Sequence, residues 1–186
     1  IGTNLINGGA DDDRIYGDSG VDTLNGDGGN DRIYGNGGND VVDGGAGDDI
    51  IGGGLGADIL RGGNDADRIY GNEGDDQIFG DSGDDRLYGL EDNDTIEGGF
   101  GDDKIYGGLG DDTLRGGNND DELYGNEGAD IVYGDDGIDK VYGNQGNDTL
   151  YGGDGADFLS GNEDDDTLYG DTGNDELFGG TGNDTL

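Results

Sequence analysis

The chain has 186 residues, of which 48 are glycine, 47 are acidic and 8 are basic, and its formal net charge is −39. Only 28% of the residues are hydrophobic, and low hydrophobicity with high net charge is typical of disorder. Cysteine and histidine are absent, which excludes disulfides, histidine-based catalysis and histidine-ligated zinc. No apolar run approaches the roughly 18 residues of a membrane-spanning helix, so we expect no membrane span. The negative charge also argues against a nucleic-acid partner.

A nine-residue period overturns the expectation of disorder. An aliphatic residue recurs at every ninth position from Ile6 to Leu186, without an insertion. Numbered from the Gly that lies seven residues before each aliphatic residue, the repeat is G-[GND]-x-[GDN]-x-D-x-U-x, where U is aliphatic. In chain order, we expect each repeat to form a tight turn at positions one to six and a short strand at positions seven to nine, beginning with residues 14–16. We predict one array over residues 1–186, with 21 repeats of which the first and last are truncated.

Positions two and four of the repeat indicate an unusual backbone. Position two is Gly, Asp or Asn in every repeat except at Leu90. Because Asp and Asn tolerate left-handed backbone angles best among the non-glycine residues, both positions are predicted to be left-handed. The exceptions to Gly at position four are Asp11, Asp65, Asp92, Asn119 and Asp164. Asp11, Asp65 and Asn119 follow a 54-residue period, and residues 53–61 resemble residues 107–115, which indicates duplicated blocks of six repeats.

The pattern resembles the RTX family of hemolysin-type calcium-binding nonapeptide repeats, whose consensus is G-G-x-G-x-D-x-U-x. Residues 44–52 match that consensus directly. The resemblance implies an all-β fold, a right-handed parallel β-roll (β-solenoid) with two nonapeptide repeats in each turn. Repeats counted as odd from Gly8 would form one parallel sheet and even repeats the other, with about ten turns and a length of roughly 48 Å. The position-eight aliphatics would point inward.

The resemblance also implies calcium between loops that lie two repeats apart. One loop would contribute its position-six Asp with the carbonyls of positions two and four, and the next its Asp with the carbonyls of positions one and three. Applied to this chain, one site would combine Gly45, Gly47 and Asp49 with Gly62, Asn64 and Asp67. The candidate metal ligands at position six are Asp13, Asp22, Asp31, Asp40, Asp49, Asp58, Asp67, Asp76, Asp85, Asp94, Asp103, Asp112, Asp121, Asp130, Asp139, Asp148, Asp157, Asp166, Asp175 and Asp184.

The number of ions follows from the number of loops. Two columns of ten complete loops leave about 18 interior sites, and that many divalent ions would reduce the net charge from −39 to −3. The alternative is that the acids only form a solvated surface. We predict weaker occupancy around Asp94, whose loop departs from the pattern at Leu90 and Asp92, and at the first loop, where Asn4 replaces Asp.

Tyrosine and the basic residues gather on one predicted sheet. All ten Tyr lie at position nine, and the odd repeats carry Tyr16, Tyr34, Tyr70, Tyr88, Tyr106, Tyr124 and Tyr142. The same repeats carry Arg14, Arg32, Arg68, Arg86, Lys104 and Lys140 at position seven. One hypothesis is structural, with stacked rings and cation–π contacts that stiffen the sheet. The other is a recognition strip for an anionic polysaccharide, which has precedent among RTX β-rolls.

Catalysis is not expected, because Ser19, Ser82 and Ser160 are scattered and have no histidine to activate them. The sequence therefore predicts a non-enzymatic, calcium-folded structural module of a secreted, extracellular or cell-surface protein, such as a fibre or surface-layer component. The chain begins and ends partway through a repeat, so we expect it to be part of a longer array or to contact further copies end to end. The alternative function is a glycan-binding β-roll attached to an enzyme or adhesin.

Overall fold

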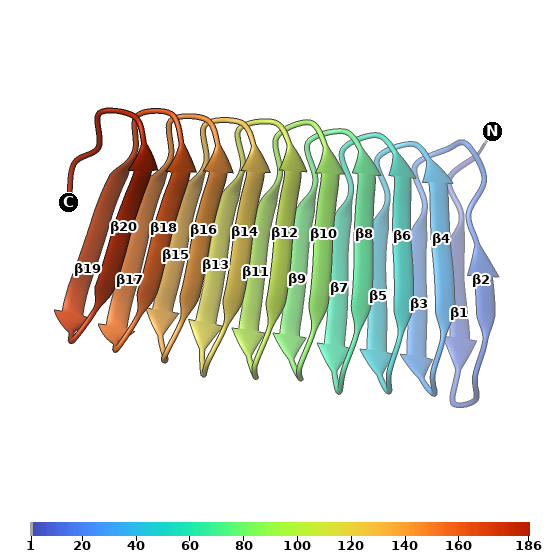
Figure 1. Cartoon of the computed structure of the whole chain (residues 1–186). Helices are drawn as coiled ribbons and strands as arrows, with labels where there is room; N and C mark the ends of the chain where they lie inside the picture. Colours follow the sequence, from blue (N-terminus) through green and yellow to red (C-terminus); the bar gives the residue numbers. More distant parts are fainter. Residues whose placement is uncertain (1) are drawn as a thin grey trace.

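Twenty strands wind into a stack of nearly identical coils in the computed structural model, which describes residues 2–186 (Figure 1). The strands are β1 Leu5–Gly9, β2 Arg14–Tyr16, β3 Thr23–Gly28, β4 Arg32–Gly37, β5 Val41–Ala46, β6 Ile50–Leu55, β7 Ile59–Asn64, β8 Arg68–Glu73, β9 Gln77–Ser82, β10 Arg86–Glu91, β11 Thr95–Phe100, β12 Lys104–Leu109, β13 Thr113–Asn118, β14 Glu122–Glu127, β15 Ile131–Asp136, β16 Lys140–Gln145, β17 Thr149–Gly155, β18 Phe158–Glu163, β19 Thr167–Gly173 and β20 Glu176–Thr181. No helix occurs among these residues, and hence none that could cross a membrane.

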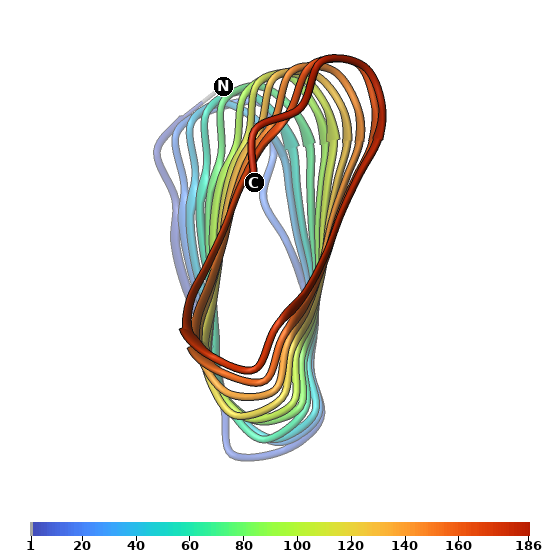
Figure 2. The same cartoon turned by 60° about the vertical axis from the view of Figure 1, so that its left-hand side comes forward.

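The strands form two parallel sheets of ten strands each, one from the odd-numbered and one from the even-numbered strands. Neighbouring strands within a sheet are two repeats apart in the sequence and pair in register, so that Ile33 lies beside Ile51. This confirms the predicted β-solenoid with an 18-residue coil and about ten turns. Seen obliquely, successive coils follow almost the same oblong path, and their loops form a column at either end (Figure 2). The repeats counted as odd from Gly8 supply the even-numbered strands, because β1 belongs to the truncated repeat before Gly8.

The core is a double column of aliphatic side chains, one from each strand. Strand residues alternate in direction, and position eight faces inward as predicted. Ile6 and Leu177 pack against the two ends of this column and are only partly buried. The fully packed members are Ile15, Leu24, Ile33, Val42, Ile51, Leu60, Ile69, Ile78, Leu87, Ile96, Ile105, Leu114, Leu123, Val132, Val141, Leu150, Leu159 and Leu168.

The strands are longer than the sequence pattern predicted. Most contain six residues, which are positions seven to nine of one repeat and positions one to three of the next. The turn is confined to positions four to six. The prediction of a three-residue strand was wrong for all but β2 among the described strands. The physical reason is alternation: position one lies two residues after the buried aliphatic, faces inward and is always Gly. A glycine needs no room in the narrow core, so the ladder continues past it.

The left-handed backbone predicted at positions two and four is confirmed in most repeats, but not at Asp18 of position two or at Asp11, Gly20, Gly137 and Gly155 of position four. At position two, φ is 69° at Asp27 and 73° at Asn36, and at position four it is 74° at Asp65 and 84° at Asn119. Leu90 adopts φ 91° at position two. A branched apolar side chain is strained in this region, so the Leu90 loop carries a local conformational cost.

Candidate metal-binding loops

The position-six aspartates are buried beneath the two columns of loops that run along the roll. From Asp22 to Asp166 they are at most 2% exposed, while Asp13, Asp175 and Asp184 on the terminal coils are partly exposed. Oδ1 of each buried Asp accepts a hydrogen bond from the backbone N–H of the position-six residue one coil earlier, which is Asn4 for Asp22 and an Asp for the others, as in the 2.8 Å bond from Asp49 to Asp67. The aspartates therefore connect successive coils in two continuous columns.

The second carboxylate oxygen has no such partner. Oδ2 is buried without a hydrogen bond in sixteen of these residues: Asp31, Asp40, Asp49, Asp58, Asp67, Asp76, Asp85, Asp94, Asp103, Asp112, Asp121, Asp130, Asp139, Asp148, Asp157 and Asp166. At Asp22, Oδ2 instead accepts from the N–H of Asp18 at 2.9 Å. An unpaired buried polar atom is costly, and sixteen repeats of the same one indicate a missing partner of constant chemistry.

At most of these residues a main-chain carbonyl from the next coil faces the same space as Oδ2. A Cβ added to Gly44 would meet Oδ2 of Asp49 below contact distance and would lie 2.6 Å from the carbonyl oxygen of Gly62. An equivalent pair of oxygens surrounds Gly35, where the added atom would meet Oδ2 of Asp40 and the carbonyl oxygen of Gly53. Two hard oxygen donors from successive loops thus converge on the space that the missing glycine side chain leaves open.

The other carbonyls of the expected site are placed less uniformly. The Gly45 carbonyl points at Gly63 on the next coil, and the Asn64 carbonyl accepts a long 3.3 Å hydrogen bond from the N–H of Gly47. A carbonyl oxygen has a second lone pair and can still bind a cation. Among residues 2–186 no three acidic side chains surround one point, so an ion here needs main-chain carbonyls in addition to the Asp pair.

Burial makes these carboxyls reluctant to ionise. It raises the pKa of Asp49 to about 6, and backbone hydrogen bonding offsets this only in part. At Asp67, Asp94 and Asp121 burial and the neighbouring aspartates raise the pKa to about 8. A cation bound beside such a column would stabilise its charged form. Calcium accepts six to eight oxygens from carboxylates and carbonyls, so this donor set fits it.

A second column of hydrogen bonds lies at position five and was not predicted. The Oδ1 atom of Asn30 accepts from the N–H of Asp48 at 3.2 Å, and Asp48 accepts from Ala66 at 3.2 Å. These side chains bond the following coil, whereas the position-six side chains bond the preceding one. The frequent Asp and Asn at position five could have indicated this column. The position also admits Ala, Val and Ile, so the sequence pattern alone does not predict a hydrogen bond there.

The tyrosines form the expected ladder on the even-numbered strands. Five rings from Tyr70 to Tyr142 stack with centroid separations of 4.8–5.0 Å, and Tyr16 stacks on Tyr34 at 5.4 Å. Gly52 interrupts the ladder as expected. At Ser160 the interruption is bridged, because Phe158 from position seven packs between Tyr142 and Phe178.

Among residues 2–186 the basic side chains of that sheet make no cation–π contact, in contrast to the structural hypothesis. Arg68 and Arg86 lie in register with Lys104, which pairs with Glu122. Cation–π contacts occur instead on the odd-numbered strands, where Arg61 lies 4.3 Å from the Phe79 ring centroid and Arg115 lies 4.2 Å from that of Tyr133. Positions seven and nine point the same way but lie too far apart along a strand, whereas position-nine residues on neighbouring strands are in direct contact. A smaller Tyr ladder follows there, from Tyr133 through Tyr151 to Tyr169.

Parallel strands on an 18-residue coil, with columns of buried oxygen donors at both ends, define a β-solenoid with repeated cation-binding loops. One family model describes four copies of the RTX calcium-binding nonapeptide repeat. It matches this chain in ten overlapping segments, from residues 1–33 to residues 151–186. The chain belongs to the RTX calcium-binding nonapeptide repeat family, so calcium is the ion that it binds. No curated protein matches the chain.

Proposed function

We propose that each gap between successive loops of a column holds one calcium ion, giving about 18 ions in the array. The position-six aspartates from Asp13 to Asp184 would supply the carboxylates, and loop carbonyls such as those of Gly45, Gly47, Gly62 and Asn64 the remaining oxygens. The observation that carries the proposal is the repeated Oδ2 atom, buried and unpaired in sixteen aspartates. The two charges of the ion offset the carboxylates that would otherwise repel each other along the columns.

We further propose that calcium binding and folding are one process. The chain has a formal charge of −39, and its core is limited to a thin double column of aliphatic side chains. Without the ion, ionised aspartates would be buried next to one another, which strongly disfavours the coil. Because the sites exist only between assembled coils, the binding free energy contributes directly to folding.

Calcium titration of metal-stripped protein tests both proposals. Far-UV circular dichroism should change from disordered to β-type as calcium is added at neutral pH, and calorimetry should find about 18 ions per chain. Magnesium should not replace calcium, because it prefers a tighter octahedral shell and retains its waters. A fully β-type spectrum in excess chelator at neutral pH, or a stoichiometry of only a few ions, would contradict the proposal.

The role that fits these properties is a structural module of an extracellular or cell-surface protein, with no catalytic activity of its own. RTX repeats are typical of secreted proteins, where calcium is abundant, and low cytosolic calcium would leave the chain unfolded for export. A stiff rod that stacks on further repeats or copies would suit a fibre or a surface layer. Size measurements by light scattering at rising calcium and protein concentrations test end-to-end association, which should lengthen the particle.

One observation favours a second candidate function, the binding of an anionic polysaccharide to the even-numbered sheet. Arg68, Arg86 and Lys104 form a cationic column on an otherwise acidic molecule. The stacked rings of the Tyr ladder cover one another's faces, so binding would depend on the cations. An alginate pull-down with the calcium-loaded protein tests this, and retention should be lost when Arg68 and Arg86 are both replaced by Gln. Absence of retention would leave the ladder with its structural role alone.

A further inference from the structure

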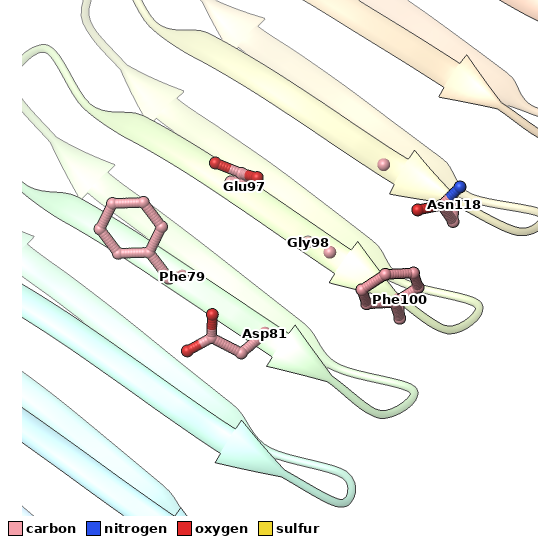
Figure 3. A pocket seen from close by; sticks show the side chains of 8 residues that line it. Phe79, Asp81, Glu97, Gly98, Phe100 and Asn118 are labelled. Carbon is pink, nitrogen blue, oxygen red and sulfur yellow. The ribbon is translucent and has the colours of Figure 1, made fainter.

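A cavity of about 290 Å³ opens on the outer face of the odd-numbered sheet, beside the loops that we expect to bind calcium (Figure 3). Phe79 and Asp81 of β9, Glu97 and Phe100 of β11 and Asn118 of β13 surround it, and the backbones of Gly98, Gly99 and Gly117 form its remaining wall. Phe100 is 63% exposed and provides an apolar edge to the cavity. The volume is at the lower end for ligand sites, so it suits one small ring.

The 54-residue duplication provides an internal comparison for this cavity. In the first copy, Arg61 lies over Phe79 and pairs with Asp81 at 3.4 Å. In the second copy, six repeats later, Arg115 lies over Tyr133. It pairs with Asp135, the residue equivalent to Asp81. The two copies therefore build the same arginine–aromatic–carboxylate cluster on the same face of the roll.

The copies differ on the next strand. In the second copy Tyr151 stacks on Tyr133, with a centroid separation of 4.8 Å and an interplanar angle of 7°. The residue equivalent to Tyr151 in the first copy is Glu97, and no ring packs on Phe79 within the described part of the chain. The cavity thus lies where the second copy holds an aromatic ring. A suitable occupant is therefore flat and about the size of one ring.

The polar lining consists mainly of hydrogen-bond acceptors. Glu97 forms no hydrogen bond or ion pair with another residue in the range 2–186, and Asp81 has only its long contact to Arg61. The Asn118 amide donates to Asp136 at 3.2 Å, which leaves its oxygen able to accept. An occupant must therefore donate several hydrogen bonds from its edge while presenting a flat face to Phe79.

We propose that this cavity is a binding subsite for a neutral pyranose ring of a glycan. The ring's C–H face would pack on Phe79, and its hydroxyls would donate to Glu97, Asp81 and the Asn118 amide oxygen. An anionic sugar is disfavoured by the two carboxylates. A cationic group is disfavoured because Arg61 already covers Phe79 and Arg115 lies in register beside Glu97.

The two copies also supply matched variants. Glu97→Tyr should close the cavity by reproducing the second copy, and Tyr151→Glu should open an equivalent cavity beside Tyr133. Both exchanges are between residues that the chain already accepts at position nine, so folding should be retained. Calcium-dependent circular dichroism verifies this for each variant and keeps a failure of calcium folding distinct from a failure of sugar binding.

The experiment is a titration of the calcium-loaded protein with methyl pyranosides of glucose, mannose, galactose and N-acetylglucosamine, followed by amide NMR. We expect at least one sugar to give saturable millimolar shifts at Gly98, Gly99 and Asn118. Phe79→Ala should weaken binding about tenfold, Glu97→Tyr should abolish it, and Tyr151→Glu should produce a second set of shifts on β17.

Three outcomes would overturn the proposal. One is the absence of saturable shifts with all four sugars. Another is binding that Glu97→Tyr leaves intact, which would place the site elsewhere. The third is tighter binding of p-cresol or N-acetylarginine amide to the same amides, which would identify the cavity as a receptor for an aromatic or cationic side chain of a partner protein.

Discussion

The N–H of Asp49 donates a 2.8 Å hydrogen bond to Oδ1 of Asp67 on the next coil, while Oδ2 of Asp67 is buried without a partner. One carboxylate therefore has two separable roles. Oδ1 accepts the hydrogen bond that links two coils, and Oδ2 is the charged oxygen that we expect to bind calcium. Asparagine retains an acceptor oxygen but removes the charge, so one substitution can distinguish the two roles.

Asp67→Asn should weaken calcium binding at the loops on either side of it by about tenfold or more, because a charged oxygen ligand is replaced by a neutral one. The coil should still form in saturating calcium, since the amide oxygen can accept the N–H of Asp49. Isothermal calorimetry should show one or two ions shifted to weaker binding among the full set.

The matched control is Asp48→Asn in the adjacent column. Asp48 is exposed and lies at position five, and Asn30 already makes the same contact one coil earlier. The control removes one negative charge from the loop one coil earlier, which faces the loop of Asp67, without removing a buried ligand. Equal losses of affinity in the two variants would show that the total surface charge, rather than the buried Oδ2, attracts calcium.

Much of this architecture is readable from the sequence because every coil repeats the same constraints. The period of Ile33 and Ile51 predicts the register, and Asp or Asn at positions such as Asn36 predicts the left-handed backbone. The strand length was missed because Gly at position one looks like a turn residue. In the structure it is an inward-facing strand residue whose missing side chain leaves space beside Asp Oδ2.

Contacts between different surface positions could not be predicted in the same way. Phe158 joins the Tyr ladder from position seven, and Arg61 at position nine pairs with Asp81 at position two of the next coil. These contacts depend on side-chain length and direction, which vary from coil to coil and do not follow the nine-residue period. The cavity beside Glu97 likewise depends on a single residue at position nine that the second 54-residue copy replaces by Tyr151.

The metal-free roll should lose stability as the pH rises. Burial raises the pKa of Asp49 to about 6 and that of Asp67 to about 8, above the ordinary value of 3.8. The folded state therefore holds protons more tightly than the unfolded chain, and this contribution is full below pH 3.8 and is lost through about pH 6–8. Thermal unfolding of metal-stripped protein should show a Tm that falls as the pH rises from acidic values, until no folded metal-free roll remains at neutral pH.

Calcium should reverse that dependence, because it binds the deprotonated carboxylates and competes with the protons. Its apparent affinity should rise over the same pH range. Exposed acids also repel one another less at low pH, so the series is repeated in high salt, which screens them but not the buried columns. A metal-free Tm that is independent of pH in high salt would argue against the raised pKa values.

Replacing the strained Leu90 by Asn should stabilise the calcium-loaded protein. Leu90 has φ 91°, while Asn72, its neighbour on the preceding coil, has φ 85° and donates from Nδ2 to the Tyr70 carbonyl at 3.3 Å. Relief of the strain should contribute about 1 kcal/mol and raise Tm by about 2–4 °C. Calorimetry should also show tighter calcium binding near Asp94, where we predict weak occupancy. The reverse change, Asn72→Leu, should lower Tm by a similar amount, and an unchanged Tm in both variants would count against this explanation.

Tyr106→Ala should destabilise the even-numbered sheet by about 1–3 kcal/mol, because Tyr106 stacks on Tyr88 at 5.0 Å and on Tyr124 at 4.9 Å. Tm in saturating calcium should fall by several degrees. Tyr16→Ala is the comparison, since its one stacking partner, Tyr34, lies farther away at 5.4 Å. If both variants lower Tm equally, the continuous stack is not what stabilises this face.

Gly44→Ala should impair calcium binding and folding together. A methyl group at this inward-facing position would meet Oδ2 of Asp49 and lie 2.6 Å from the carbonyl oxygen of Gly62, in the space where we place the ion. In Gly28→Ala, the matched control, the nearest heavy atom is the Ala46 carbonyl oxygen at 3.9 Å. Position three already carries Ala46 on the next coil, so the control should bind calcium normally. We expect Gly44→Ala to lose at least one ion by calorimetry and to require more calcium for its β-type circular dichroism. Normal stoichiometry in Gly44→Ala would place calcium elsewhere in the loop, because an ion and a methyl group cannot share this space.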